Sequence, residues 1–289
     1  MYGTALDQTQ GVGGITAPEP VGWRLEDIDF AAIDPVLANE NEALLLLLVA
    51  SSFIESGTRL YASNLVVHFE GDHEVSAWLA EHWEPEELQH GRALRAYVAC
   101  VWPSFDWDRA YVDFIQAYRP LCTMGKLEAR RGLEMAARCV VETGTTTLYR
   151  AIHHRVREPV LRTLLRHISE DELQHYKHFF RYFRNYQQQE RSSRAAVFGA
   201  LIRRTAEISR EDTDIGLRYA CAERCRGTTH APLPFDELQR AVRALLRSSV
   251  PIGLAGAMWL RPLQLGPYAE RQARRIFSLA ARTVMACSA

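Results

Sequence analysis

Hydrophobic residues recur with the period of an α-helix over almost the whole chain after residue 36, and alternating strand patterns are nearly absent. Turn signals such as Gly71-Asp72 and Glu158-Pro159 separate the periodic segments. The pattern predicts an all-α protein. The expected helices cover 37–70, 75–101, 107–118, 125–156, 159–187, 193–208, 236–248 and 267–286. Residues 209–235 include two prolines and predict mostly loop around a short helix.

The organisation along the chain predicts three parts. Residues 1–35 begin with a Gly- and Pro-rich stretch without periodicity and are expected to form a flexible arm. Residues 36–190 are expected to form a helical bundle, and residues 191–289 a helical C-terminal extension packed on it.

Few features point to a membrane or to secretion. We expect no signal peptide, because no basic region opens the chain. The longest apolar run, Ala43–Ala50, has eight residues, whereas about 20 span a bilayer. Six scattered cysteines are typical of a reducing compartment. We therefore expect a cytoplasmic protein without membrane insertion, and no nucleic-acid partner.

Charge is unevenly distributed although the net charge is only −1. Residues 1–190 carry 18 Lys and Arg against 27 Asp and Glu, whereas residues 191–289 carry 16 against 8, and all 16 are Arg. One interpretation is a basic docking surface for an acidic partner, with Arg203 and Arg204 as candidate contacts. The other is that these arginines pair with the acidic first 190 residues.

A polar motif occurs twice, as "PEELQHG" ending at Gly91 and as "EDELQHY" ending at Tyr176. A second pair of similar stretches, "ESGTRLY" from Glu55 and "ETGTTTLY" from Glu142, precedes the two motifs at nearly the same spacing. The economical explanation is a duplicated helix hairpin.

The spacing places the acidic residues at one level of such a bundle. Glu55 and Glu87 lie symmetrically about Gly71, and Glu142 and Glu172 lie symmetrically about the turn before Pro159. Residues equidistant from the turn of an antiparallel hairpin face each other, and Glu and His three residues apart share one helix face. Four carboxylates and two imidazoles at one level suit two iron or manganese ions.

The order E…ExxH…E…ExxH resembles the ferritin-like di-iron carboxylate proteins, and "WEPEELQHG" resembles the soluble acyl-carrier-protein desaturases, over about residues 40–190. Gln89 and Gln174 depart from the Arg that those desaturases usually carry. The resemblance implies a ferritin-like four-helix bundle core with additional C-terminal helices, two Fe ions (Fe/Fe, or alternatively Fe/Mn) and O2 as co-substrate. The implied metal ligands are Glu55, Glu87, His90, Glu142, Glu172 and His175.

Further residues receive roles beside these ligands. The resemblance makes Thr145 a catalytic candidate that manages protons, and Thr58 is its counterpart in the first repeat; the alternative is that such a threonine bonds its own helix carbonyl. Glu86 and Asp171 are expected to accept hydrogen bonds from the metal-bound imidazoles, or else to be ordinary surface acids. His178 is expected beside the ligands. Trp83 packs in the core or lies on an electron route.

The implied reaction is O2-dependent oxidation of an unactivated C–H bond, as in an acyl desaturase or a hydroxylase. N-oxygenation of a small amine is the alternative, and ferritin- or erythrin-like iron storage or peroxide scavenging is the non-enzymatic alternative. Leu94 occupies the position where a radical-generating reductase subunit would carry Tyr. The expected partners are a ferredoxin-like electron donor, an acidic acyl-carrier protein and a second copy in a homodimer.

Overall fold

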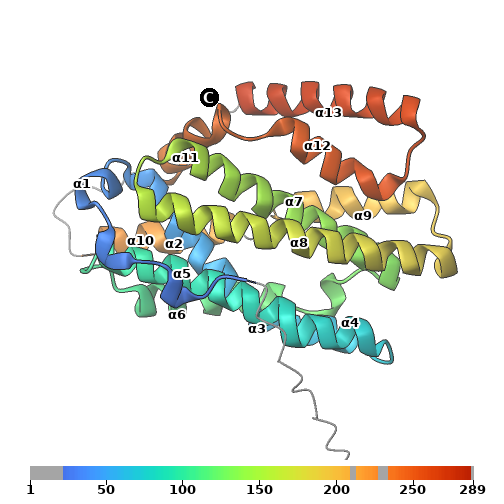
Figure 1. The fold of residues 1–289 in the computed structure, drawn as a ribbon, viewed down its shortest axis with the longest axis horizontal. Helices are drawn as coiled ribbons and strands as arrows, with labels where there is room; N and C mark the ends of the chain where they lie inside the picture. Colours follow the sequence, from blue (N-terminus) through green and yellow to red (C-terminus); the bar gives the residue numbers. More distant parts are fainter. Residues whose placement is uncertain (1–21, 209–212, 227–233, 288–289) are drawn as a thin grey trace, which may run out of the picture.

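A computed structural model describes residues 22–208, 213–226 and 234–287, and every regular element in these ranges is helical (Figure 1). The predicted all-α class is confirmed. Short 3₁₀ turns connect some of the helices. The α-helices are α1 (Pro35–Ala38), α2 (Glu42–Gly57), α3 (Arg59–His68), α4 (His73–Trp78), α5 (Glu84–Val101), α6 (Trp107–Tyr118), α7 (Arg131–Arg155), α8 (Pro159–Glu190), α9 (Arg194–Glu207), α10 (Thr213–Cys225), α11 (Phe235–Arg247), α12 (Ile252–Leu260) and α13 (Pro267–Cys287).

Two helical hairpins form the centre of the molecule. In the first, α2 continues into α3 and the chain returns through α4 into α5; in the second, α7 returns as α8. Gly71 turns the first hairpin with a φ of +88°, and the side chain of Asp72 caps α4 by accepting from the Val75 amide. Glu158 caps α8 by accepting from two backbone amides, and Pro159 follows as the first helical residue.

A π-helical segment, Leu79–Trp83, joins α4 to α5, and the Glu84 amide donates to the Leu79 carbonyl five residues back. Pro85 explains this irregularity, because proline has no amide hydrogen and its ring crowds the carbonyl four residues before it. The wider π-helical turn allows the helical conformation to continue across Pro85. It also sets the direction in which the following "EELQH" side chains point.

Helices α2 and α5 approach closely at Gly91, the glycine that ends the first motif. A Cβ atom at this position would lie 2.7 Å from the Ser56 backbone nitrogen and 3.1 Å from the Ser56 Cα. Gly144 in α7 differs, because a Cβ there meets nothing within 4 Å. Glycine is therefore required at 91 by a close backbone approach.

The apolar core consists of two clusters along the hairpins. One contains Leu44–Phe53, the second half of α5, and the segment where α7 returns into α8. The other contains buried residues of α3, α4, the first part of α7 and the second part of α8. The polar motif residues of all four chain segments fall between the two clusters, so they form a layer at mid-height.

The C-terminal extension adds helices to the outside of the hairpins: α9 and α12 contact α7, α10 contacts α2 and α6, and α13 lies over α12 (Figure 1). The short helix expected within residues 209–235 is α10, which has 13 residues. α12, in contrast, was not among the expected helices. Gly216 of α10 packs directly against Ala50, a tertiary contact that local patterning does not reveal.

Residues 22–35 are packed on the bundle, although they were expected to belong to the flexible arm. Trp23 and Ile28 are buried, and two 3₁₀ turns follow Trp23. Residues 1–21 lie outside the described ranges. The segment packs because Trp23 finds polar partners in α5 and α8, which its local sequence does not indicate.

Arginines of the extension pair with acids of the first 190 residues. The bidentate pair of Arg203 with Glu128 has N–O distances of 2.9 and 2.6 Å. Arg204 is largely buried and binds Glu134 and Glu207. Further such pairs are Arg224–Glu42 and Arg226–Asp113. The two arginines considered as docking contacts are thus engaged within the chain.

One continuous helical segment, Glu42–His68, is long and apolar enough to cross a membrane. However, 78% of its most apolar window is buried inside the protein, as in the core helix of a soluble protein.

Gly91→Ala should destabilise the protein by about 1–3 kcal/mol, because the added methyl overlaps Ser56 and forces α2 and α5 apart. Gly144→Ala is the matched control and should be neutral or stabilising by up to about 1 kcal/mol, because alanine favours the helix. Urea denaturation of both variants measures the difference. A Gly91→Ala protein as stable as Gly144→Ala would show that the helix contact yields without cost.

Candidate metal centre

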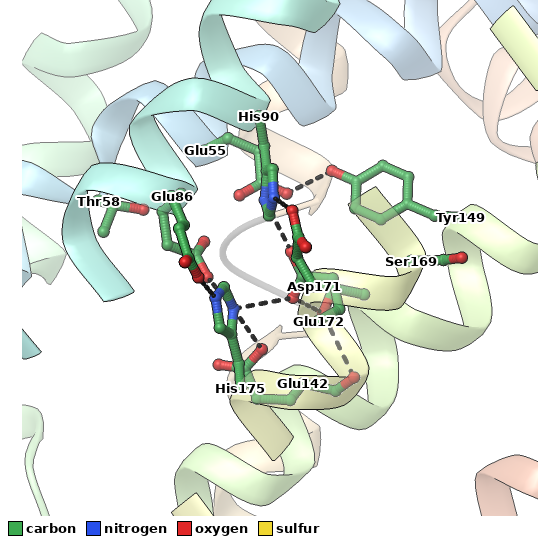
Figure 2. Close-up of polar contacts among 12 residues, drawn as sticks. Glu55, Thr58, Glu86, His90, Glu142, Tyr149, Ser169, Asp171, Glu172 and His175 are labelled. Carbon is green, nitrogen blue, oxygen red and sulfur yellow. Dashed lines mark hydrogen bonds and ion pairs between the residues drawn. The ribbon is translucent and has the colours of Figure 1, made fainter. Parts of the chain in front are cut away.

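The six ligand candidates meet in the polar layer between the two apolar clusters. α2 contributes Glu55, α5 contributes Glu87 and His90, α7 contributes Glu142, and α8 contributes Glu172 and His175, all at most 5% exposed. Figure 2 shows the side chains converging from the four helices. They form two sets of four whose ligand atoms lie within 4.8 Å of one another: Glu55, Glu87, His90, Glu172 and Glu87, Glu142, Glu172, His175.

Two carboxylates, Glu87 and Glu172, belong to both sets. A carboxylate has two oxygens and can bridge two cations, so the arrangement provides two neighbouring sites with one terminal carboxylate and one imidazole each. His90 Nδ1 lies 3.0 Å from Glu172 Oε1, and His175 Nδ1 lies 3.0 Å from Glu87 Oε1.

The inner ligand atoms lack conventional partners. Within the described ranges, both carboxylate oxygens of Glu142 are buried without a hydrogen bond, and the Nδ1 atoms of His90 and His175 face only carboxylate oxygens of the other candidate ligands. Such orphaned groups are costly unless a cation satisfies them. The donor set of carboxylate oxygens and imidazole nitrogens without thiolate fits iron or manganese.

The pKa values of the ligands show how strongly their charges interact. Burial raises the pKa of Glu55 and of Glu142 well above the usual range, and the neighbouring carboxylates add to the effect. Burial alone would lower the pKa of His90, but the hydrogen bond with Asp171 and the contact with Glu172 outweigh it and raise the pKa. Protons therefore compensate the carboxylates when no metal does.

The acid before each motif Glu binds the histidine of the other motif. His175 Nε2 donates to Glu86 Oε2 at 2.7 Å, and His90 Nε2 donates to Asp171 Oδ2 at 3.0 Å. Each acid points across to the opposite hairpin, because it is rotated about 100° from the ligand that follows it. These bonds hold the proton on Nε2 and direct Nδ1 toward the ligand layer.

The two threonines that follow the single glutamates differ. Thr145 Oγ1 lies 2.6 Å from Glu172 Oε2, to which it donates; the Val141 and Glu142 carbonyls are farther, at 3.3 and 3.4 Å. Thr58 forms its bond with the Tyr61 hydroxyl at 3.1 Å instead of with a ligand.

The remaining candidates lie outside the ligand sets. Trp83 is buried between Tyr61 and Phe179. His178 stacks on Trp78 with ring centroids 4.9 Å apart, and Trp78 in turn packs edge-on against His175.

Two further residues at the centre were not among the sequence candidates. The Tyr149 hydroxyl donates a short hydrogen bond to Glu55 (Figure 2). Its position seven residues after Glu142, two helical turns along the same face, was the available signal. Trp23 Nε1 donates to Asp171 Oδ2 at 2.7 Å, and its ring lies parallel to His90. No local pattern indicated Trp23.

No protein-family profile, curated protein or solved structure matches this chain. The functional argument therefore depends on the geometry of the centre.

The purified protein loaded with iron or manganese should hold about two ions per chain, one for each ligand set. Glu172→Ala should reduce the content to well below one, because this residue contributes to both sets. Glu170→Ala is the matched control on the exposed face of α8 and should keep both ions. Elemental analysis measures the content, and equal loss in both variants would contradict the assignment.

The metal-free protein should lose stability as the pH rises above about 6.5, the ordinary imidazole pKa. The folded pKa values of His90 and His175 are raised, so their protonation stabilises the fold at low pH and is lost as pH passes through the folded values. The raised pKa values of Glu55 and Glu142 act in the same direction.

Metal-loaded protein should depend less on pH, because cations replace these protons, and loading should release protons into a weakly buffered solution. Urea unfolding at several pH values and a pH-stat measure both effects. Metal-free stability that increases with pH over this range would contradict the charge balance.

Proposed function

We propose that the protein is a ferritin-like di-metal oxidoreductase that uses O2 to oxidise an organic substrate, with two iron ions, or one iron and one manganese. The observation that carries this proposal is the pair of four-ligand sets that share Glu87 and Glu172. Each set would hold one ion through carboxylates and one imidazole, and ions held by such ligands would supply redox chemistry with O2.

Two bound ions of this kind would pass electrons from an external donor to O2, chemistry that side chains alone do not provide. Glu87 and Glu172 would contribute to both ions. His90 and His175 are oriented by Asp171 and Glu86, so their inner nitrogens stay in place during changes of metal charge. Buried surroundings exclude water from the layer.

We assign to Thr145 the movement of a proton at the centre. Reduction of O2 consumes protons. The Thr145 hydroxyl lies beside the ligand layer and donates to Glu172 Oε2 over a distance of 2.6 Å. A hydroxyl both donates and accepts, so it can pass a proton toward the layer without binding metal. The hydrogen bond also holds Glu172 in the orientation in which both sets use it.

The proposed reaction is hydroxylation or desaturation at a C–H bond. Hydroxylation consumes O2, two electrons and two protons and releases water with the product; an external donor, such as a ferredoxin-like protein, supplies the electrons. Desaturation draws two electrons from the substrate and two from the donor, and releases two waters.

Thr145→Val should slow O2 consumption by iron-loaded protein about tenfold or more while leaving the iron content unchanged, because only the hydroxyl is lost. Thr147→Val is the matched control: its hydroxyl bonds only backbone carbonyls of the same helix. An oxygen electrode with a chemical reductant measures the rate, and elemental analysis the iron.

Loss of iron in Thr145→Val would reassign this residue to a structural role. An unchanged rate with full iron content would remove it from the proton path. Iron storage is distinguished by loading, because a mineral store takes up many ions per chain, whereas the proposed enzyme saturates at about two.

A further inference from the structure

A small cavity of about 80 Å³ adjoins the metal layer on the side of α3, α7 and α9. Its lining includes Ile54 and Val141, the residues that immediately precede the ligands Glu55 and Glu142. The 118–127 segment and Arg204 of α9 complete the wall. None of the six ligand candidates is in this lining, so the cavity lies next to the ligand layer and extends from there toward the C-terminal extension.

Arg138 is the distinctive residue of this lining. It is 5% exposed and lies one helical turn before Glu142 on the same face of α7. Its Nε donates to the buried Glu134 at 2.8 Å, whereas its Nη1 and Nη2 have no hydrogen-bond partner within the described ranges. A buried guanidinium with its paired outer donors unused matches the geometry of a carboxylate ligand.

A second arginine adds to the same preference. Arg204 binds Glu134 and Glu207 through its Nη atoms, and its Nε is buried without a hydrogen bond. Glu134 and Glu207 both pair with Arg204, and Glu134 also pairs with the Nε of Arg138. The outer donors of Arg138 are therefore the positions left for an anionic ligand.

We propose that this cavity is the substrate site and that the substrate is a small free carboxylic acid, whose carboxylate binds Arg138 and whose carbon chain points to the metal layer. The inference rests on the proposed function. The volume is well below the roughly 300–1,000 Å³ of typical ligand pockets, which suits a short chain. A carrier-bound acyl thioester is disfavoured, because it has no carboxylate for Arg138.

The test is calorimetric binding of straight-chain monocarboxylates, from acetate to octanoate, to metal-loaded protein, with primary amides of equal length as uncharged probes. Short carboxylates should bind about tenfold or more tightly than their amides, since a hydrogen bond to a charged group is worth this factor. Octanoate should bind more weakly than butyrate.

The double variant Glu134→Gln/Arg138→Gln removes both members of the buried pair and leaves Arg204 with Glu207 as its partner. It should abolish the preference for the carboxylate while keeping about two ions per chain. Arg203→Gln, on the exposed side of α9, is the matched control and should keep the preference. Leu121→Trp provides a second variant that narrows the cavity without touching the buried pair; it should weaken binding of all probes.

The outcomes separate the two proposals. Three results would overturn the substrate assignment: equal binding of carboxylates and amides, unchanged carboxylate binding in the double variant, or tightest binding of octanoate. In each case a content of two bound ions would still support the metal centre. Carboxylate binding that requires metal but not Arg138 would show that the probe binds to the metal ions. This result would also overturn the substrate assignment. Absence of bound metal would instead defeat the proposed function.

Discussion

The structure depends on one constraint: the charges of the carboxylates and imidazoles that are buried between the two apolar clusters must be compensated. Four carboxylates and two imidazoles are almost completely buried between two apolar clusters, with no solvent to stabilise them. Burial and the neighbouring carboxylates raise the pKa of Glu55 and Glu142, and carboxylate partners outweigh burial and raise the pKa of both histidines, so protons offset part of this charge. A cation that replaced these protons would therefore couple its binding to folding at this layer.

The surrounding structure fixes where these charges point. Two hydrogen bonds connect the hairpins at the candidate ligands: Glu86 of the first hairpin accepts from His175 of the second, and Asp171 of the second accepts from His90 of the first. The π-helical segment before Pro85 and the contact at Gly91 determine how α5 lies against α2. Local irregularities thus set the positions of the carboxylates, and a binding site of this kind tolerates displacements of less than about 1 Å.

The C-terminal extension gives the centre an asymmetric environment. Its arginines are largely used inside the chain, where Arg203 and Arg204 bind acids near the start of α7. This pairing converts the charge asymmetry of the sequence into an internal contact between the extension and the bundle. It also places Arg204 beside Arg138 in the lining of the same cavity. The two hairpins are similar in sequence but are therefore surrounded by different residues.

The sequence by itself determined the helical class, the turns at Gly71 and Glu158, and the set of six ligand candidates, because these follow from periodicity, capping chemistry and equal spacing about a turn. Other features were decided only by the tertiary structure. The packing of Trp23 on His90, the contact of Gly216 in α10 with Ala50, and the pairing of Arg204 with Glu134 depend on residues distant in the chain. Short-range patterns specify which face of a helix is polar, whereas the partner that meets that face is selected by packing of the whole chain.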